Sequence, residues 1–203
     1  MSYERLCLEI RNTFEKEEDI RLGKQLRSCI FLRACIDETL RMSPPVGSSP
    51  WREVGPGGET IAGQFIPQGC SVGTGIYSMH HNDAFFENAH EFSPERWLPE
   101  HNAESATEKA GKPAFMPFST GPRSCIGRSL ANAEVSLTIA VLLWRFDFRT
   151  SSQLNHEVGG GKAMQMKGTA GRANPAEFQL IDWVVGRPEG PMLEFRRRNV
   201  SRV

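Results

Sequence analysis

Apolar residues recur at helical spacing in two segments near the start of the chain. Residues 1–22 carry scattered apolar positions that predict one or two short helices, with the polar KEEDI stretch as a break. From about Gly23 the pattern is stronger, and four apolar residues share one helical face: Leu22, Leu26, Ile30 and Ala34. This helix must end before Pro44-Pro45, because a proline pushes the preceding residue out of the α region.

The pattern changes to one of strands and loops over residues 44–113. Residues 44–78 place β-branched residues between recurring Gly and Pro, which predicts short strands joined by turns. Residues 79–113 predict mostly loop, with one aromatic-rich piece, FFENAHEFSPERWLPE. The polar stretch HNAESATEKAGKP predicts a mobile surface insert.

The remainder of the chain predicts a second strong helix and two strands. Apolar runs place the helix from Arg128 to about Phe146. Residues 151–175 are glycine-rich and predict a long loop. The end, FQLIDWVVGRPEGPMLEFRRR, predicts two strands around a Gly-Pro turn, as a terminal hairpin. Helices and strands are therefore partly segregated, which indicates an α+β fold that is mainly α.

Composition and charge narrow the class of protein. The 203 residues suffice for one domain or a large part of one. Lys+Arg and Asp+Glu both number 24, so charge gives no support to a general affinity for nucleic acid or acidic membranes. The five cysteines form no C-x-x-C pair, which argues against a disulfide framework and a structural zinc site: Cys7, Cys29, Cys35, Cys70 and Cys125.

Cys125 lies in an unusual setting, the stretch FMPFSTGPRSCIGRSLA. It is placed at, or just before, the N-terminus of the second helix, where unpaired N–H groups and the helix dipole favour a thiolate. Gly121 permits a tight turn, and Gly127 leaves room for something bulky to approach. Arg123 adds a positive charge and Phe118 a flat apolar face. These residues predict a thiolate ligand presented from a turn.

A buried structural cysteine is the ordinary interpretation of such a residue, since free Cys usually behaves as a small hydrophobe. A cysteine-nucleophile hydrolase needs a base near Cys125, and the nearby sequence offers none. The surrounding pattern F-x-x-G-x-R-x-C-x-G instead resembles the haem-binding loop of the cytochrome P-450 superfamily. The resemblance implies that Cys125 is the axial ligand to haem iron, that Phe118 packs beside the thiolate, and that Gly121 and Gly127 shape the loop.

Two further stretches are similar to the same family. ETLR contains E-x-x-R, so Glu38 and Arg41 share a helix face and can pair, although such pairs alone are common and worth little at a surface. FSPERW resembles the family's F-x-P-E-R-[FW] segment and contains Arg96. The resemblance implies that these three residues form a charged cluster beneath the haem, with a structural rather than a catalytic part.

Weaker similarities concern the rim of the implied haem site. Arg52 stands where the family usually has an arginine that reaches a haem propionate, and Arg123 is implied to contact a propionate too; a planar guanidinium suits a carboxylate. His80 lies in SMHHND, where the family often has H-R-D, and is expected near the haem edge. A solvated loop histidine is an equal alternative. A metal cluster with His81 and His90 is disfavoured, because the spacing suits no helix face.

The resemblance runs from about residue 5 to residue 198 and implies the C-terminal part of the cytochrome P-450 fold, within residues 1–203 as part of a single domain. The implied elements are a K-type helix, a small β-sheet, a meander, the ligand loop with its long helix, and a terminal β-hairpin. The implied cofactor is haem b, iron protoporphyrin IX. The implied reaction inserts one O₂ oxygen into a small organic substrate, with electrons from an NAD(P)H-dependent reductase. No nucleic-acid partner is implied. The sequence resembles eukaryotic, possibly fungal, members of the family.

Three family segments are not found in this sequence: A-G-x-[DE]-T of the distal helix, W-x-x-x-R, and the N-terminal membrane anchor. We therefore expect the proximal face of a haem pocket without its distal face, and helices with exposed apolar surfaces. A full-length parent is expected at the cytosolic face of the endoplasmic reticulum membrane, and this chain, having no anchor, in the cytoplasm. The alternative is a truncated, non-catalytic fragment that binds haem or another protein.

Overall fold

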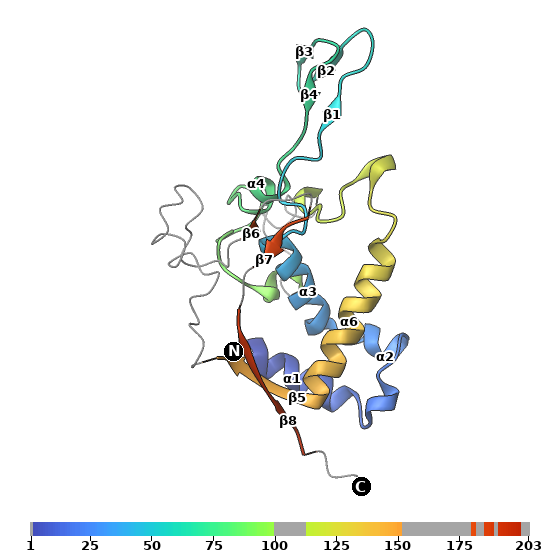
Figure 1. Ribbon diagram of the computed structural model, residues 1–203, viewed down its shortest axis with the longest axis vertical. Helices are drawn as coiled ribbons and strands as arrows, with labels where there is room; N and C mark the ends of the chain where they lie inside the picture. The colour runs from blue at the N-terminus through green and yellow to red at the C-terminus, as the bar shows by residue number, and fades with distance from the viewer. Residues whose placement is uncertain (1, 100–112, 152–179, 182–184, 189–190, 200–203) are drawn as a thin grey trace.

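The computed structural model describes residues 2–99, 113–151, 180–181, 185–188 and 191–199 (Figure 1). The α-helices are α1 (Ser2–Thr13), α2 (Lys24–Arg27), α3 (Ile30–Met42), α4 (Ile76–His80) and α6 (Arg128–Arg145). Short 3₁₀ helices are η1 (Glu17–Asp19), η2 (Pro94–Trp97) and η3 (Gly121–Arg123). The strands are β1 (Arg52–Glu53), β2 (Glu59–Ile61), β3 (Gln64–Ile66), β4 (Ser71–Val72), β5 (Phe146–Thr150), β6 (Leu180–Ile181), β7 (Arg187–Pro188) and β8 (Leu193–Arg197).

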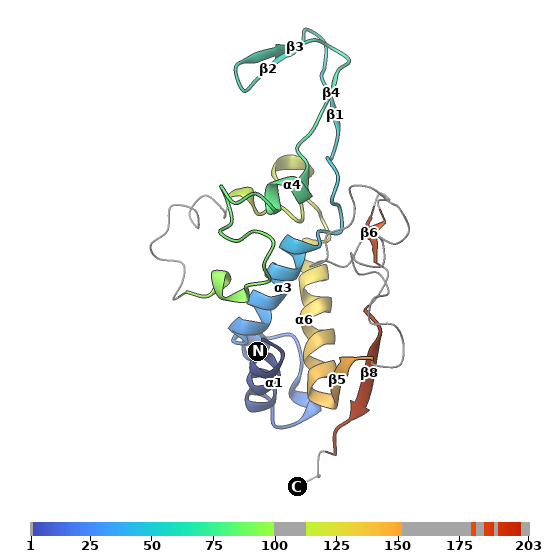
Figure 2. The ribbon, with the colours of Figure 1, turned by 90° about the vertical axis from the view of Figure 1, so that its left-hand side faces the viewer.

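The main core lies where α1, α3 and α6 pack against one another (Figure 2). Apolar side chains from these helices and from the connection between α1 and α3 are buried there: Cys7, Ile10, Phe14, Ile20, Leu26, Cys29, Leu32, Ile36, Ala140 and Leu143. Burying one large apolar side chain contributes about 1.5–3 kcal/mol. Helices this short are marginal alone, so this packing rather than helix propensity stabilises the bundle.

The helix predicted to run from about Gly23 is broken into α2 and α3. Cys29 separates the two segments with non-helical backbone angles, φ −75° and ψ 80°. The predicted apolar face is accordingly wrong at two of its positions, because Leu26 and Ala34 are buried whereas Leu22 and Ile30 are 61% and 49% exposed. The predicted end before Pro44-Pro45 is confirmed, since α3 ends at Met42.

The break follows from how α3 begins. The Glu9 carboxylate of α1 accepts the backbone N–H of Phe31 at 2.8 Å and that of Leu32 at 2.7 Å. These N–H groups belong to the first turn of α3 and have no partner within the helix. Glu9 therefore caps α3 from a distant helix, and the negative charge also suits the helix N-terminus.

The strands predicted within residues 44–78 are confirmed, but they form two-stranded ribbons rather than one small sheet. β1 pairs antiparallel with β4, and β2 pairs antiparallel with β3. Ala62 and Gly63 turn the β2–β3 hairpin with φ of 49° and 81°, the left-handed values that a tight hairpin turn requires. Together the ribbons make an arm that projects from the helical body (Figures 1 and 2), with Trp51 62% exposed and Phe65 65% exposed.

The C-terminal strands pair differently from the predicted hairpin. β8 runs antiparallel to β5, with Phe195 opposite Phe148, while β6 pairs with β7. The Phe195 ring contacts both Phe148 and Phe146, with centroids 5.4 and 5.9 Å apart. β5 directly follows α6 and offers these aromatic partners, so the long-range pairing is preferred. The predicted loop at 151–175 and the predicted insert at 101–113 fall almost wholly outside the described residues.

The helix predicted from Arg128 is confirmed as α6, and its outer surface carries exposed apolar side chains. Only Ala140 and Leu143 of its 18 residues are buried among the described neighbours. Leu130 is 64% exposed and Val135 is 41% exposed. This matches the expectation of helices with uncovered apolar faces.

We predict that Glu9→Ala lowers the free energy of unfolding of the chain by about 0.5–2 kcal/mol, the usual cost of losing a helix cap. The first turn of α3 loses both of its acceptors, so its helical signal should fray first. Urea denaturation followed by circular dichroism measures the effect. Glu15→Ala is the control, because Glu15 is exposed. Equal denaturation midpoints for the two variants would show that the cap contributes nothing.

Candidate functional site

A completely buried ion pair lies at the centre of the site. Glu38 and Arg41 are one turn apart on α3, and both have no exposed surface. Arg41 Nε donates to Glu38 Oε2 and Arg41 Nη2 donates to Glu38 Oε1, each at 2.9 Å. The attraction within a buried ion pair offsets the cost of removing its charges from water only where the remaining donors and acceptors of the two side chains are also hydrogen-bonded.

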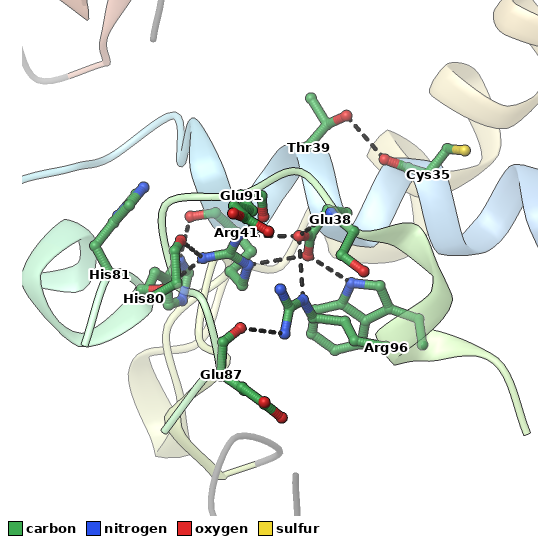
Figure 3. Close-up of polar contacts among 12 residues, drawn as sticks. Cys35, Glu38, Thr39, Arg41, His80, His81, Glu87, Glu91 and Arg96 are labelled. Atoms are coloured by element: carbon green, nitrogen blue, oxygen red, sulfur yellow. Dashed lines mark hydrogen bonds and ion pairs between the residues drawn. The ribbon is translucent and has the colours of Figure 1, made fainter. Parts of the chain in front are cut away.

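The Glu38 carboxylate meets that condition through the segment that contains η2 (Figure 3). Its Oε1 accepts the Ser93 N–H at 2.9 Å and Arg96 Nε at 3.1 Å. Its Oε2 accepts the indole N–H of Trp97 at 2.9 Å. The structure thus brings together Glu38, Arg41 and Arg96, the three residues of the predicted charged cluster, and adds Trp97 to them.

The guanidinium of Arg41 holds three separate carbonyl groups in addition. It donates to the carbonyl oxygens of His80 at 2.7 Å, Ala89 at 2.6 Å and Glu91 at 3.1 Å. With the two bonds to Glu38, every one of its five N–H donors is used. The segment from α4 to η2 is therefore folded around one side chain of α3.

These contacts decide the charge state of Glu38. Burial on its own raises the pKa of a carboxyl group. The hydrogen bonds and charge of Arg41, the Ser93 N–H and the charge of Arg96 outweigh burial and hold the pKa of Glu38 below its ordinary value. The carboxylate therefore stays ionised, and the stability that it provides is lost as the pH falls through its folded-state pKa.

Trp97 was missed by sequence reasoning, although its indole N–H completes the Glu38 site. Its ring also packs against Phe115 and Phe86, with centroids 4.5 and 6.3 Å away. Phe115 opens the stretch that leads to Cys125. An aromatic residue with one N–H directly after P-E-R was the signal, because a buried Trp usually finds an acceptor for its indole.

His80 lies in the interior and not at an exposed rim. It is completely buried, with Nδ1 3.0 Å from the Arg41 carbonyl oxygen and Nε2 3.0 Å from the Met116 backbone nitrogen. Burial lowers the pKa of His80 to about 4. Both ring nitrogens are occupied by backbone groups, so the predicted contact with a cofactor and the alternative of a solvated histidine are both corrected.

The alternative of a histidine metal cluster also finds no support. His81 stacks on Tyr77 at 3.9 Å and lies 5.1 Å from the His90 ring. Among the residues that the structure describes, no three His, Cys, Asp or Glu side chains are grouped to hold a metal ion.

The cysteine loop, residues 118–127, lies nearer the surface than the buried cluster. Cys125 is exposed and precedes Gly127, the residue before the first turn of α6. The Cys125 N–H donates to the Phe118 carbonyl at 2.8 Å, and the Arg128 N–H donates to the Cys125 carbonyl at 3.3 Å. Gly121 has φ +70°, a conformation that other residues rarely adopt, so the predicted need for glycine in this turn is met.

The side chains around the thiol leave it open. A Cβ added to Gly127 meets only the Cys125 Sγ, at 3.7 Å. Arg128 lies over the Phe118 ring at 5.9 Å, a cation close to the loop that sequence reasoning did not single out. Arg123 is exposed on η3.

Arg52 is exposed on the arm, where it donates to the Trp51 carbonyl at 2.8 Å and to the Pro50 carbonyl at 3.3 Å. Neither Arg52 nor Arg123 makes an ion pair within the described residues. Both guanidinium groups are therefore available to an anionic partner.

Comparison with known proteins decides the family. Residues 2–165 match the family model described as Cytochrome P450. The chain belongs to the cytochrome P450 family. It is 46% identical over 200 residues to the cytochrome P450 monooxygenase apf8 of Gibberella fujikuroi, and 44% identical over 199 residues to the cytochrome P450 monooxygenase AKT7 of Alternaria alternata. A cytochrome P450 monooxygenase of Gibberella zeae is 42% identical over 197 residues.

These matches cover 97% of this P450 chain but 51%, 38% and 44% of the respective relatives. The chain thus spans about half the length of the curated relatives, or less, and corresponds to their C-terminal portion. The predicted family and its fungal character are confirmed. Among the described residues, no helix combines the length and the apolar character that crossing a membrane needs.

An apolar cavity of about 560 Å³ lies between the helices of this P450 chain. Its lining includes Cys35 and Leu40 of α3, Val135 of α6, and Phe118 at the edge of the cysteine loop. Cys125 itself is not part of the lining. Phe118 therefore faces the apolar interior while its carbonyl holds the exposed cysteine.

We predict that Glu38→Ala destabilises the chain by about 3–5 kcal/mol, since it leaves the buried Arg41 and Arg96 charges without a partner. Loss of this size is comparable with the total stability of many domains. Chemical denaturation measures it.

The matched control is Arg33→Ala on the same helix. Arg33 pairs with Asp37 at 2.8 Å, and the two side chains are 41% and 14% exposed, so the loss should be about 1–3 kcal/mol, below that of Glu38→Ala. If Glu38→Ala costs no more than Arg33→Ala, the buried cluster does not organise the fold.

Proposed function

We propose that this P450 chain holds haem b through the Cys125 thiolate and belongs to a haem-thiolate monooxygenase. The observation that carries the proposal is the exposure of Cys125 in a fixed loop at the N-terminus of the 18-residue helix α6. Cys7, Cys29 and Cys35 are buried, and the exposed Cys70 is on the projecting arm. A ligand must present its sulfur outward, and Cys125 does so.

The donor set fits a haem group. A thiolate is a known axial ligand of haem iron, and Cys125 lies just before the first turn of α6. Gly121 and Gly127 keep side chains away from the loop. The packing of Phe118 beside the thiolate stays a prediction from the resemblance, because its side chain lines the interior cavity and Cys125 does not. Arg52 and Arg123 have exposed guanidinium groups that suit the two propionates.

The described elements also suit the finer parts of the family fold. We assign α3, with its Glu38–Arg41 pair, as the K-type helix, and the loop around η2 as the meander. α6 is then the long helix that follows the ligand loop. Residues 1–203 form the C-terminal part of one haem-thiolate domain.

When bound, a thiolate-ligated haem supplies the activation of dioxygen, because the sulfur pushes electron density toward iron and favours O–O cleavage. This chain contributes the ligand and its support. The bond from the Cys125 N–H to the Phe118 carbonyl orients the loop, and Arg52 and Arg123 bind carboxylates. The Glu38 cluster is too deeply buried to touch a substrate and acts through the fold.

The whole reaction inserts one oxygen atom of O₂ into a small organic substrate. An NAD(P)H-dependent reductase supplies the electrons. The three relatives are each named as cytochrome P450 monooxygenases, which supports this reaction class. Location at the endoplasmic reticulum membrane stays a prediction from the resemblance.

The test is haem binding by the purified chain, reduced with dithionite and exposed to carbon monoxide. We predict a thiolate-type difference band that Cys125→Ser abolishes, because a hydroxyl does not supply a thiolate to iron. Cys70→Ser is the matched control, since it also replaces an exposed cysteine, and should keep the band.

A band that survives in Cys125→Ser would refute the ligand assignment. Turnover of an organic substrate with a reductase then separates the two functions left open by the sequence. Coupled oxidation supports the monooxygenase, whereas haem binding without turnover supports the non-catalytic fragment.

A further inference from the structure

The His80 side chain connects the buried cluster to the segment leading into the cysteine loop through hydrogen bonds. It ends α4, and its own carbonyl accepts Arg41 Nη1 at 2.7 Å. Its ring reaches the Arg41 carbonyl on one side and the Met116 N–H on the other, each at 3.0 Å.

The partners fix the protonation of the ring. A backbone N–H can only donate, so Nε2 must accept the Met116 N–H and carries no proton. A carbonyl can only accept, so Nδ1 carries the proton and donates it to the Arg41 carbonyl. Full burial between the Phe115 and Phe86 rings favours this neutral form.

Met116 continues the connection toward the thiol. Its carbonyl accepts the Ser119 N–H at 2.9 Å, which closes the turn that contains Phe118. The Phe118 carbonyl in turn accepts the Cys125 N–H at 2.8 Å. A continuous series of hydrogen bonds therefore runs from Arg41 through His80 to the backbone that presents Cys125.

We propose that His80 is a positioning residue, which sets the start of the cysteine loop against the Glu38–Arg41–Arg96 cluster by accepting the Met116 N–H. It touches neither haem nor substrate. The consequence for ligation rests on the proposed function, in which Cys125 binds haem iron. Nothing else among the described residues accepts the Met116 N–H, so loss of the His80 acceptor leaves a part-buried donor unsatisfied.

Two substitutions separate the two bonds of the ring. The amide of glutamine reaches the place of Nε2, so the oxygen of His80→Gln can accept the Met116 N–H. The shorter amide of asparagine reaches only the place of Nδ1, so His80→Asn keeps the donor to Arg41 and loses the acceptor for Met116. If His80 only filled space, His80→Gln and His80→Asn would have the same effect on the exchange of the Met116 amide.

The experiment is amide hydrogen exchange on the full chain, with the α3 amides as the internal reference for global opening. In His80→Asn we expect Met116 exchange to accelerate about ten- to hundredfold relative to α3, together with a weakened thiolate-type carbon monoxide band. In His80→Gln, Met116 exchange should stay within about threefold of the unsubstituted chain. His81→Asn is the matched control, because its ring contacts the Tyr77 carbonyl of its own turn, and it should change neither reading.

Equal Met116 exchange in His80→Asn and His80→Gln, whether fast or slow, would overturn the proposal. Acceleration in His81→Asn as large as in His80→Asn would overturn it as well. If the unsubstituted chain shows no band that depends on Cys125, the proposed function fails. The exchange rates then still decide whether His80 positions the loop.

Discussion

The structure depends on one buried negative charge. Glu38 has no exposed surface, and an ionised carboxylate in such a place requires nearly all of its acceptor capacity to be used. One partner, Arg41, is local, but Ser93, Arg96 and Trp97 lie more than one element away along the chain. The fold offsets the cost of burying this charge by bringing the η2 segment back onto α3.

That constraint links the fold to the proposed haem site. Arg41 donates its remaining N–H groups to backbone carbonyls of the α4–η2 segment. The His80 ring in turn accepts the Met116 N–H. Trp97 packs on Phe115, beside the same segment. The interior cluster and the exposed Cys125 are thus joined in one hydrogen-bonded arrangement, through which the buried charges would support the proposed ligation.

Much of this arrangement could be predicted from local sequence. The end of α3, α6 and the strands of the arm follow from periodicity and proline positions, and the members of the charged cluster follow from the resemblance to the P450 family. The features that were wrong depend on distant partners. The break at Cys29 arises from a cap supplied by Glu9, and β8 pairs with β5 because of aromatic contacts across the chain. His80 binds two backbone groups, which leave no signature in residue type.

A double-mutant cycle between Glu38 and Arg96 tests the central claim most directly. The free energy of unfolding is measured for the unsubstituted chain, Glu38→Gln, Arg96→Gln and the double variant. Because the two side chains are bonded at 3.1 Å inside one network, we predict a coupling energy of about 0.5–3 kcal/mol. Additive effects, with coupling near zero, would contradict the claim that Glu38 holds the η2 segment to α3.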